Sequence, residues 1–312
     1  MDARKKLDEI LVSRQVVLVT GKGGVGKSVV TAALALRARS LGLRPLVFEC
    51  DAPARQSLLP KGRPASDEVE EVAPGILGIN QKGDDAIRDY AAASLPSKTV
   101  ADLLFENRVA RLFLKASPSV SEMALVGRVA ILADKHGADG PVLVDLHATG
   151  HAVSLLRAPG GIMKVLRTGV LYERARKIEE MLQDPVRTAF VTVALPEELP
   201  VTELLELHEK LREIGAPEGP VVLNGVFREP APDVSDEVLA HIEKGPALAK
   251  NAARDLAALR AWARRSAREE NRLRDALAKT RGDNAIATVP FFIDDGNAAE
   301  LTQRIADHLG AP

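Results

Sequence analysis

A glycine-rich stretch near the amino terminus has the residue types and the spacing of a loop that binds phosphate. Residues 21–28 read Gly-Lys-Gly-Gly-Val-Gly-Lys-Ser and fit the pattern G-x-x-x-x-G-K-[ST]. Glycines let successive backbone N–H groups turn toward an anion, and a helix that follows adds the positive end of its dipole. The chemistry indicated is the binding of a nucleotide and the transfer of its terminal phosphoryl group.

Two side chains of this loop have predicted roles of their own. We expect Lys27 to reach the β- and γ-phosphates and the Ser28 hydroxyl to be a ligand of Mg²⁺. The residues expected to line the nucleotide here are Gly21, Gly23, Gly24, Val25, Gly26, Lys27, Ser28 and Val29.

Acidic residues stand where two predicted strands end. Asp145 ends the apolar run 142–144, and Asp51 follows the run 46–48. Because the carboxyl ends of parallel strands meet at the crevice where ligands bind, both carboxylates are expected near the phosphates. An apolar run ending in Asp indicates a residue that holds Mg²⁺ directly or through water, which favours Asp145 for that role. Asp51 is then expected to orient the attacking water, whereas Glu49 is interpreted as a polar residue that the strand tolerates.

The elements that must position these residues alternate between strands and helices. Such alternation predicts an α/β fold with a doubly wound, mostly parallel sheet and helices on both faces. The predicted strands are 16–19, 46–48, 76–79, 142–145, 190–193, 221–224 and 286–289. The predicted helices include 2–13, 29–40, 202–214, 298–309 and a long helix over 248–279.

Two stretches show only helical patterns, and we expect them to form a helical insertion. They cover approximately residues 84–137 and 161–183. Since no linker composition divides the chain, residues 1–312 are expected to form a single domain that carries this insertion.

Composition excludes several classes of protein. The 312 residues hold 42 Lys plus Arg against 43 Asp plus Glu, and this near-neutral charge argues against a general nucleic-acid-binding function. A single cysteine, Cys50, excludes an intramolecular disulfide framework and any multi-cysteine metal site. No apolar stretch approaches the roughly 20 residues of a membrane span, and residues 1–9 are charged, unlike a signal peptide. A cytoplasmic location is therefore expected.

A second lysine in the loop, Lys22, limits the classes of phosphate-loop protein that this sequence resembles. Residues 22–28 resemble the deviant phosphate loop of a class of dimeric ATPases. That class includes the arsenical pump ATPase, the tail-anchored-protein targeting ATPase, the partitioning ATPases and the nitrogenase iron protein. The segment Asp145-x-x-x-Thr149-Gly150-His151 resembles the second switch of the arsenical pump and tail-anchored-targeting ATPase family in particular. The usual Thr-Ala-Pro between Asp and Thr is replaced here by Leu-His-Ala.

The resemblance implies a phosphate-loop fold, Mg²⁺–ATP as the ligand and slow ATP hydrolysis by a dimer. It implies that Lys22 crosses the dimer interface to the partner's nucleotide, where it adds a cation as charge develops on the phosphoryl group. It also implies that the switch residues Asp145, Thr149, Gly150 and His151 respond to loss of the γ-phosphate.

The resemblance extends to the base of the nucleotide. Asn224 ends a predicted strand that is similar to the family's strand with an adenine-reading Asn, and Pro290 begins a loop similar to the one that covers the base. An Asn side chain can pair with both a donor and an acceptor on an adenine edge. The guanine-binding pattern Asn-Lys-x-Asp is absent from the sequence, so ATP is favoured over GTP.

The partner of the expected ATPase is left open by the sequence. The dimer is expected to be a homodimer or a heterodimer with a paralogous ATPase. One hypothesis is a carrier that binds a protein client, such as a membrane protein, in a groove lined by residues 100–114; a plain core is the other interpretation of that segment. A second hypothesis is an ATP-gated switch that assembles with a partner, such as a paralogous ATPase or a cytoskeletal protein. The third is a partitioning-type ATPase that uses the basic run 260–281 on DNA or on a membrane. The Thr149-Gly150-His151 motif argues against it. That run is otherwise a solvated helix face.

Overall fold

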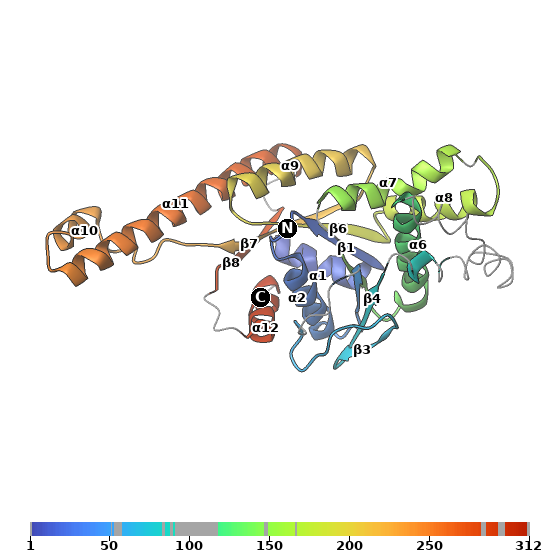
Figure 1. The fold of residues 1–312 in the computed structure, drawn as a ribbon, viewed down its shortest axis with the longest axis horizontal. Helices are drawn as coiled ribbons and strands as arrows, with labels where there is room; N and C mark the ends of the chain where they lie inside the picture. The colour runs from blue at the N-terminus through green and yellow to red at the C-terminus, as the bar shows by residue number, and fades with distance from the viewer. Residues whose placement is uncertain are drawn as a thin grey trace.

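The fold is built on one eight-stranded sheet with the order β3-β4-β2-β5-β1-β6-β7-β8 (Figure 1). The computed structural model describes residues 2–50, 52, 58–82, 85–87, 90, 118–146, 149–165, 167–281, 285–292 and 297–310. The strands are β1 (Val16–Gly21), β2 (Leu46–Cys50), β3 (Glu70–Ala73), β4 (Ile76–Gln81), β5 (Val142–Asp145), β6 (Thr188–Ala194), β7 (Glu218–Val226) and β8 (Ile286–Pro290).

The central strands are parallel and buried on both faces. β1 lies between β5 and β6, and its six residues are all buried, as a continuous apolar run predicts. Alternate residues of β1 supply two cores: Val17 and Val19 face one layer of helices, and Val16 and Leu18 face the other. The predicted doubly wound, mostly parallel fold is confirmed.

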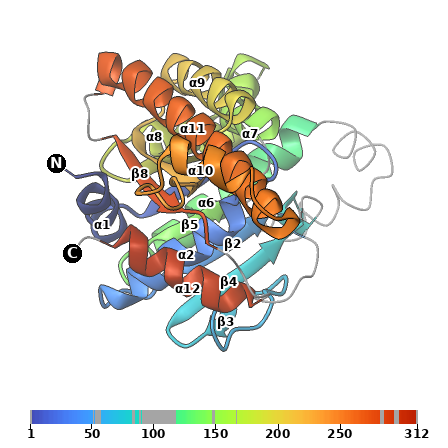
Figure 2. The same cartoon turned by 90° about the vertical axis from the view of Figure 1, so that its left-hand side faces the viewer.

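Helices cover both faces of the sheet (Figures 1 and 2). The layer that packs with Val17 and Val19 contains α1 (Ala3–Ser13), α2 (Lys27–Ser40) and α12 (Ala298–Leu309). The opposite layer contains α6 (Pro118–His136), α7 (Thr149–Val165), α8 (Val170–Gln183), α9 (Glu198–Glu213) and the anchored part of α11 (Ala247–Arg281). Figure 2 shows the two layers above and below the strands.

One edge strand was not predicted. β3 pairs antiparallel with β4, and its sequence Glu-Glu-Val-Ala lacks the continuous apolar run of the central strands. Val72 packs closely over Gly78 of β4, where a Cβ atom would lie 2.7 Å from a Val72 methyl group. A glycine in the partner strand therefore makes room for the only buried, β-branched residue of β3.

The predicted helical stretch 161–183 contains the end of one helix and the whole of a second. α7 begins earlier, at Thr149, and ends at Val165, and α8 begins at Val170 after Gly169. Gly169 has φ 100°, a backbone conformation that favours glycine and stops a helix from continuing. The other predicted helical stretch contributes α6, which packs against β5 as well as α7 and α8. Residues 91–117 lie outside the described part of the chain, so the boundaries of the helical insertion stay a prediction.

A long helical arm leaves the sheet from the carboxyl end of β7 (Figure 1). The chain passes through the short helix α10 (Asp236–Ile242) and returns along α11, which has 35 residues and is about 52 Å long. The long helix was predicted and α10 was not. The returning half of α11 is fixed to the body, since Ser266 Oγ accepts a hydrogen bond from the Phe227 amide at 3.2 Å.

A buried carboxylate strengthens this attachment. Glu270 is only 5% exposed and binds Arg228 and Arg274, each at 2.8 Å. Burial alone would raise the pKa of Glu270, but hydrogen bonds from Arg274 and Arg228 outweigh burial and lower it. Next to this group, Phe227 stacks on Trp262 with ring centroids 4.1 Å apart. Across the part of the chain that is described, no helix joins the length and the apolar composition that a bilayer crossing would require.

Candidate functional site

The loop 21–28 has the backbone conformation that its glycines predict. It joins the end of β1 to the first turn of α2, and Gly21, Gly24 and Gly26 have φ values of 155°, 86° and 92°. A Cβ atom at Gly26 would lie 2.4 Å from Asn224 Nδ2, and one at Gly21 would lie 2.2 Å from the Val193 carbonyl oxygen. Gly21 therefore requires glycine for space, because its neighbour is backbone, whereas a side chain at Gly26 would have to displace the end of the Asn224 side chain; both positions favour glycine for conformation.

Ser28 and Asp145 meet at the carboxyl edge of the sheet. Ser28 is the second residue of α2, and Asp145 is the last residue of β5, which pairs with β1 so that Asp145 lies opposite Val19. The Ser28 hydroxyl donates a hydrogen bond to Asp145 Oδ2 at 2.6 Å. A hydroxyl and a carboxylate are both hard oxygen donors, so this pair fits the predicted Mg²⁺ site.

Lys27 lies beside this pair. Its ammonium donates a hydrogen bond to the Lys22 carbonyl oxygen at 3.0 Å, so the side chain folds back over the loop. Burial lowers the pKa of Lys27, and the negative charge of Asp145 offsets part of that effect.

Lys22 forms an ion pair that the sequence did not predict. Its ammonium contacts Glu203 Oε1 at 2.8 Å, and both side chains are about one-third exposed, at 29% and 32%. Glu203 lies in the second turn of α9, whose apolar residues Val201, Leu204 and Leu207 are buried. Residues 195–203 carry a signal for Glu203, since they resemble a turn and helix with a glutamate in the arsenical pump and tail-anchored-targeting ATPase family. No local pattern connects that residue with Lys22.

A second carboxylate, which the sequence alone predicts to be only a tolerated polar residue of its strand, lies next to Asp145. Glu49 of β2 is the register partner of Asp145 in β5. Burial raises the pKa of Glu49, and the charge of Asp145 raises it further. The signal that could have identified this neighbour was the pairing of the two strands, which neither local sequence reveals.

Asn224 joins β7 to the loop. Its side-chain Nδ2 donates a hydrogen bond to the Val25 carbonyl oxygen at 3.0 Å. Pro290 is the last residue of β8 and pairs in register with Val226 of β7. The two residues predicted to contact the base thus lie on neighbouring strands at the same edge as Ser28.

Some predicted site residues fall outside what the structure describes. Asp51 is one of them, so its expected role stays a prediction. Thr149, Gly150 and His151 form the first turn of α7, and only their backbone is described. Within the same limits, the described side chains include no cluster of three or more metal-binding residues.

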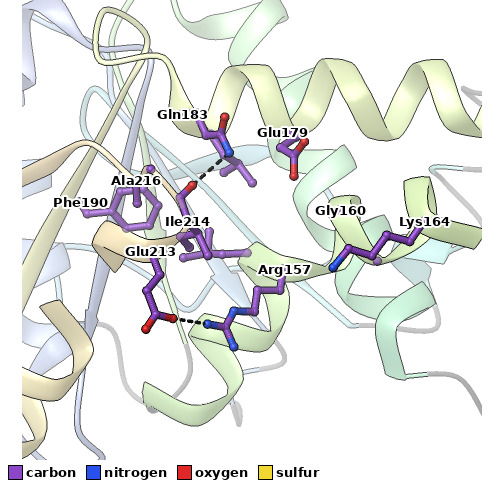
Figure 3. A pocket seen from close by; sticks show the side chains of 13 residues that line it. Arg157, Gly160, Lys164, Glu179, Gln183, Phe190, Glu213, Ile214 and Ala216 are labelled. Carbon is purple, nitrogen blue, oxygen red and sulfur yellow. Dashed lines mark hydrogen bonds and ion pairs between the residues drawn. The ribbon is translucent and has the colours of Figure 1, made fainter. Parts of the chain in front are cut away.

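A pocket of about 740 Å³ lies away from the loop, between α7, α8 and the segment that follows α9 (Figure 3). Phe190, near the start of β6, and the residues before β7 contribute to its floor, which places it toward the amino ends of the strands. Arg157 and Glu213 form an ion pair at 2.8 Å on its rim, and Gln183 donates a hydrogen bond to the Ile214 carbonyl at 3.0 Å. This pocket is therefore separate from the phosphate loop.

Known proteins resemble this chain over most of its length. The family model of the CobQ/CobB/MinD/ParA nucleotide-binding domain matches residues 16–303. ATPase BagA of Mycobacterium tuberculosis is 26% identical over 224 residues, which are 66% of this chain and 64% of that protein. An arsenical pump-driving ATPase of Escherichia coli is 27% identical over 241 residues, 71% of this chain and 40% of that protein. An uncharacterized protein of Streptomyces coelicolor is 33% identical over 173 residues, covering 53% of this chain and 43% of its own length.

The matched regions span less than two thirds of these relatives' own lengths. The family itself is nevertheless clear, because its model covers the sheet from β1 to β8 together with the loop 21–28 and Asp145. The chain belongs to the CobQ/CobB/MinD/ParA nucleotide-binding domain family.

Proposed function

We propose that this protein is a Mg²⁺-dependent ATPase that works as a dimer and changes its hold on a protein client as ATP is hydrolysed. The observation that carries the proposal is the 2.6 Å contact between Ser28 and Asp145 beside Lys27, at the start of a helix that follows a glycine loop. This is the arrangement of groups that an Mg²⁺-bound triphosphate requires.

Each group in cis has a distinct task in this proposal. Backbone N–H groups of residues 21–29 bind the phosphates, and Lys27 leaves the Lys22 carbonyl to contact the β- and γ-phosphates. Ser28 and Asp145 hold Mg²⁺, with Asp145 acting through water. The bound ion neutralises charge on the phosphates. Asp51 orients the attacking water, and Asn224 and Pro290 contact the adenine.

The dimer supplies one further group. Lys22 of each protomer reaches the nucleotide of the other and stabilises the charge that develops as the phosphoryl group leaves. The partner is a second copy or a paralogous ATPase. In either case hydrolysis is slow until the two protomers meet, because each site is incomplete alone.

The proposal that a protein client binds and is released during the ATP cycle rests on the position of α7. This helix begins at Thr149, four residues after Asp145, and its other end forms one wall of the 740 Å³ pocket. A change in the switch at 145–151 when the γ-phosphate leaves would therefore reach the layer of α7 and α8 directly. A protein client, such as a membrane protein, is favoured over a metalloid, because the single cysteine, Cys50, is buried and only 5% exposed.

One observation supports a second candidate, a partitioning-type ATPase that contacts DNA. Arg264, Arg265 and Arg268 of α11 are exposed, whereas Arg272 and Arg274 are engaged by Glu269 and Glu270 of the same helix. Two of the arginines of the basic run therefore pair within the helix, whereas Arg264, Arg265 and Arg268 are exposed to phosphate groups.

A trapped-state pull-down tests the proposal. Asp51→Asn is expected to bind Mg²⁺–ATP without hydrolysing it and to hold the closed dimer. Proteins that co-purify with this variant are compared in ATP and in ADP, with Lys27→Ala as the nucleotide-binding control. Enrichment of membrane proteins in ATP alone supports a carrier, and enrichment of one soluble paralogue supports a heterodimeric switch. An identical set of proteins in ATP, ADP and the control contradicts a nucleotide-driven client cycle.

A further inference from the structure

The side chain of Asn80, in β4, forms two hydrogen bonds with the backbone of a single residue, Ala52. The Ala52 N–H donates to Asn80 Oδ1 at 3.0 Å, and Asn80 Nδ2 donates to the Ala52 carbonyl oxygen at 2.7 Å. An Asn side chain carries an acceptor and a donor on one amide, so it can bind both polar groups of a peptide backbone. Asn80 thereby pairs with the chain beyond Cys50, where β2 ends, as a neighbouring strand would.

The sequence around Ala52 suits this contact. Pro53 follows Ala52, and a proline disfavours the helical conformation of the residue before it. In an extended residue the N–H and the carbonyl oxygen point to the same side of the chain, where one amide group can meet both. Asp51, the residue expected to orient the attacking water, comes immediately before Ala52 in the sequence. Asn80 therefore holds the backbone one residue after the proposed catalytic carboxylate.

We propose that Asn80 is a positioning residue, which holds the backbone at Ala52 so that the Asp51 carboxylate is kept where it can orient the attacking water. This inference rests on the proposed function, because it assumes that Asp51 acts in ATP hydrolysis. Asn80 itself contacts no reacting atom in this proposal. It acts on the reaction only through the backbone at residue 52.

Asn80 is suited to this task because it is fixed from both sides of its strand. β4 pairs with β2, where Asn80 is the register partner of Glu49, and the Asn80 N–H donates to the Ser66 carbonyl oxygen at 2.6 Å. Ile76 and Ile79 of the same strand are completely buried, one in each core of the sheet. The side chain therefore extends from a rigid strand and gives the chain after β2 a fixed reference point.

The position of Asn80 along the sheet places the contact at the level of the proposed Mg²⁺ site. Asn80 is the register partner of Glu49, which is in turn the register partner of Asp145. Register partners on neighbouring parallel strands point to the same face of a sheet, so the three side chains form one row across β4, β2 and β5. The Ser28 hydroxyl bonds to Asp145 at the end of this row at 2.6 Å. The backbone that Asn80 holds thus follows the strand next to the proposed metal ligands.

Loss of the contact is expected to slow hydrolysis more than it weakens nucleotide binding. A displacement of about 1 Å can cost about 100-fold in rate, so a carboxylate whose support is only loosened should cost about tenfold. The loop 21–29 is proposed to bind ATP, and this loop does not depend on the contact. The affinity for ATP should therefore stay within about twofold of the wild-type value.

The first measurement examines the contact itself, without nucleotide. Asn80→Leu keeps the approximate volume of the side chain and removes both hydrogen bonds. Hydrogen exchange of the Ala52 amide, followed by NMR, is expected to be roughly tenfold faster in this variant than in the wild type. Asn80→Asp keeps an acceptor for the Ala52 N–H and should retain most of the protection.

An amide of the same strand provides the internal control for exchange. The Leu77 N–H donates to the Pro45 carbonyl oxygen at 2.9 Å and should exchange at its wild-type rate in Asn80→Leu. A rate that is unchanged at Ala52, or raised equally at Ala52 and Leu77, would overturn the inference, whatever the protein's function.

The second measurement examines the role of the contact. ATP affinity is measured by equilibrium titration, and hydrolysis by single-turnover phosphate release, in the wild type, Asn80→Leu, Asp51→Asn and the double variant. Asn80→Leu is expected to slow hydrolysis about tenfold in the wild-type background and to cause no further loss when Asp51 is already changed. Val72→Ala is the matched control, because it removes an apolar contact over Gly78 at the same edge of the sheet and leaves Asn80 in place. It should lose stability and keep wild-type hydrolysis.

The outcomes of the second measurement separate the inference from the proposed function. Wild-type hydrolysis in Asn80→Leu, or the same loss in both Asp51 backgrounds, would show that Asn80 does not act through Asp51. A loss of ATP affinity as large as the loss of hydrolysis would also overturn the positioning role. Failure of the wild type to hydrolyse ATP would instead contradict the proposed function, and the inference about Asp51 would fall with it.

Discussion

The Ser28 hydroxyl and the Asp145 carboxylate lie 117 residues apart in the sequence and are joined by a 2.6 Å hydrogen bond. The contact exists because β5 pairs in parallel with β1, so that the end of one strand meets the helix that follows the other. Two oxygen donors, one from a helix and one from a strand, are thereby held at one point beside Lys27. The metal dependence of the protein should follow from this pair.

Ser28→Ala and Asp145→Asn are each expected to raise the Mg²⁺ concentration for half-maximal ATP hydrolysis by at least about tenfold. The first removes an oxygen ligand of the ion, and the second removes the negative charge that holds the ion through water. Steady-state hydrolysis over a Mg²⁺ titration measures the change. Ser40→Ala, at the far end of the same helix, is the control and should match the wild type. An unaltered Mg²⁺ requirement in both site variants would remove this pair from the metal site.

Lys22→Ala is expected to leave ATP affinity within about twofold of the wild type and to reduce turnover by about 10³-fold. The physical reason is that a cation supplied in trans stabilises the transferring phosphoryl group more than the bound ground state. Nucleotide affinity is measured by equilibrium titration and turnover by phosphate release. Mixing Lys22→Ala with Lys27→Ala supplies the control, because only a lysine acting across the interface can restore activity to the mixed dimer. Full turnover in Lys22→Ala alone would be incompatible with a role in trans.

Two glycines of the chain allow the effect of a steric clash to be measured separately from the effect of backbone strain. Gly26 and Gly42 both have positive φ values, 92° and 83°, but only at Gly26 would a Cβ atom meet a neighbour, Asn224 Nδ2 at 2.4 Å. Gly26→Ala and Gly42→Ala should each lose about 1–2 kcal/mol of stability from the left-handed conformation. Only Gly26→Ala should also lose more than about tenfold in ATP affinity. Urea denaturation and nucleotide titration of both variants test this, and equal affinity losses would refute a specific role for Gly26.

The elements that depend on a local residue pattern could be predicted from the sequence. Continuous apolar runs predicted the central strands, and the glycine loop was correctly placed between a strand and a helix, although α2 begins at Lys27 and not at residue 29. β3 was missed because a short edge strand is partly solvent-exposed and needs no apolar run. The break before α8 was missed because the apolar pattern continues on both sides of Gly169.

The site was only partly predictable for a related reason. The register partner Glu49 and the ion pair of Lys22 with Glu203 both depend on which elements become neighbours in space. Side chains that are 181 residues apart leave no local trace of their contact. Motifs therefore identified the residues that we propose to bind the nucleotide, whereas the residues that contact them emerged only from the fold.

Glu270 predicts a pH dependence of stability for the attachment of α11. Its pKa is lowered in the folded protein, so its ionised form contributes stability above its ordinary pKa of about 4.5, and that contribution is lost as the pH falls through the lower folded value. Glu270→Gln should therefore cost about 1–3 kcal/mol at pH 7, and the cost should shrink as the pH is lowered below about 4.5. Urea denaturation at several pH values measures it, with the exposed Glu243→Gln as control. A cost that stays constant with pH would assign the effect to packing.

The exposed arginines of α11 decide between a surface that is merely solvated and one that binds nucleic acid. If the second candidate function is correct, a variant with Arg264, Arg265 and Arg268 all changed to Gln should lose most of its affinity for duplex DNA. The slope of log affinity against log salt should fall by about 2 to 3, because each arginine that contacts a phosphate releases about one counterion. If the protein is instead a carrier of protein clients, neither the wild type nor the triple variant should bind DNA measurably at physiological salt. A mobility-shift assay over a range of salt concentrations separates the two outcomes. The control changes Lys244 and Lys250 to Gln near the tip of the arm. It removes positive charge at another place and so tests whether the position of the charge matters as well as the net charge.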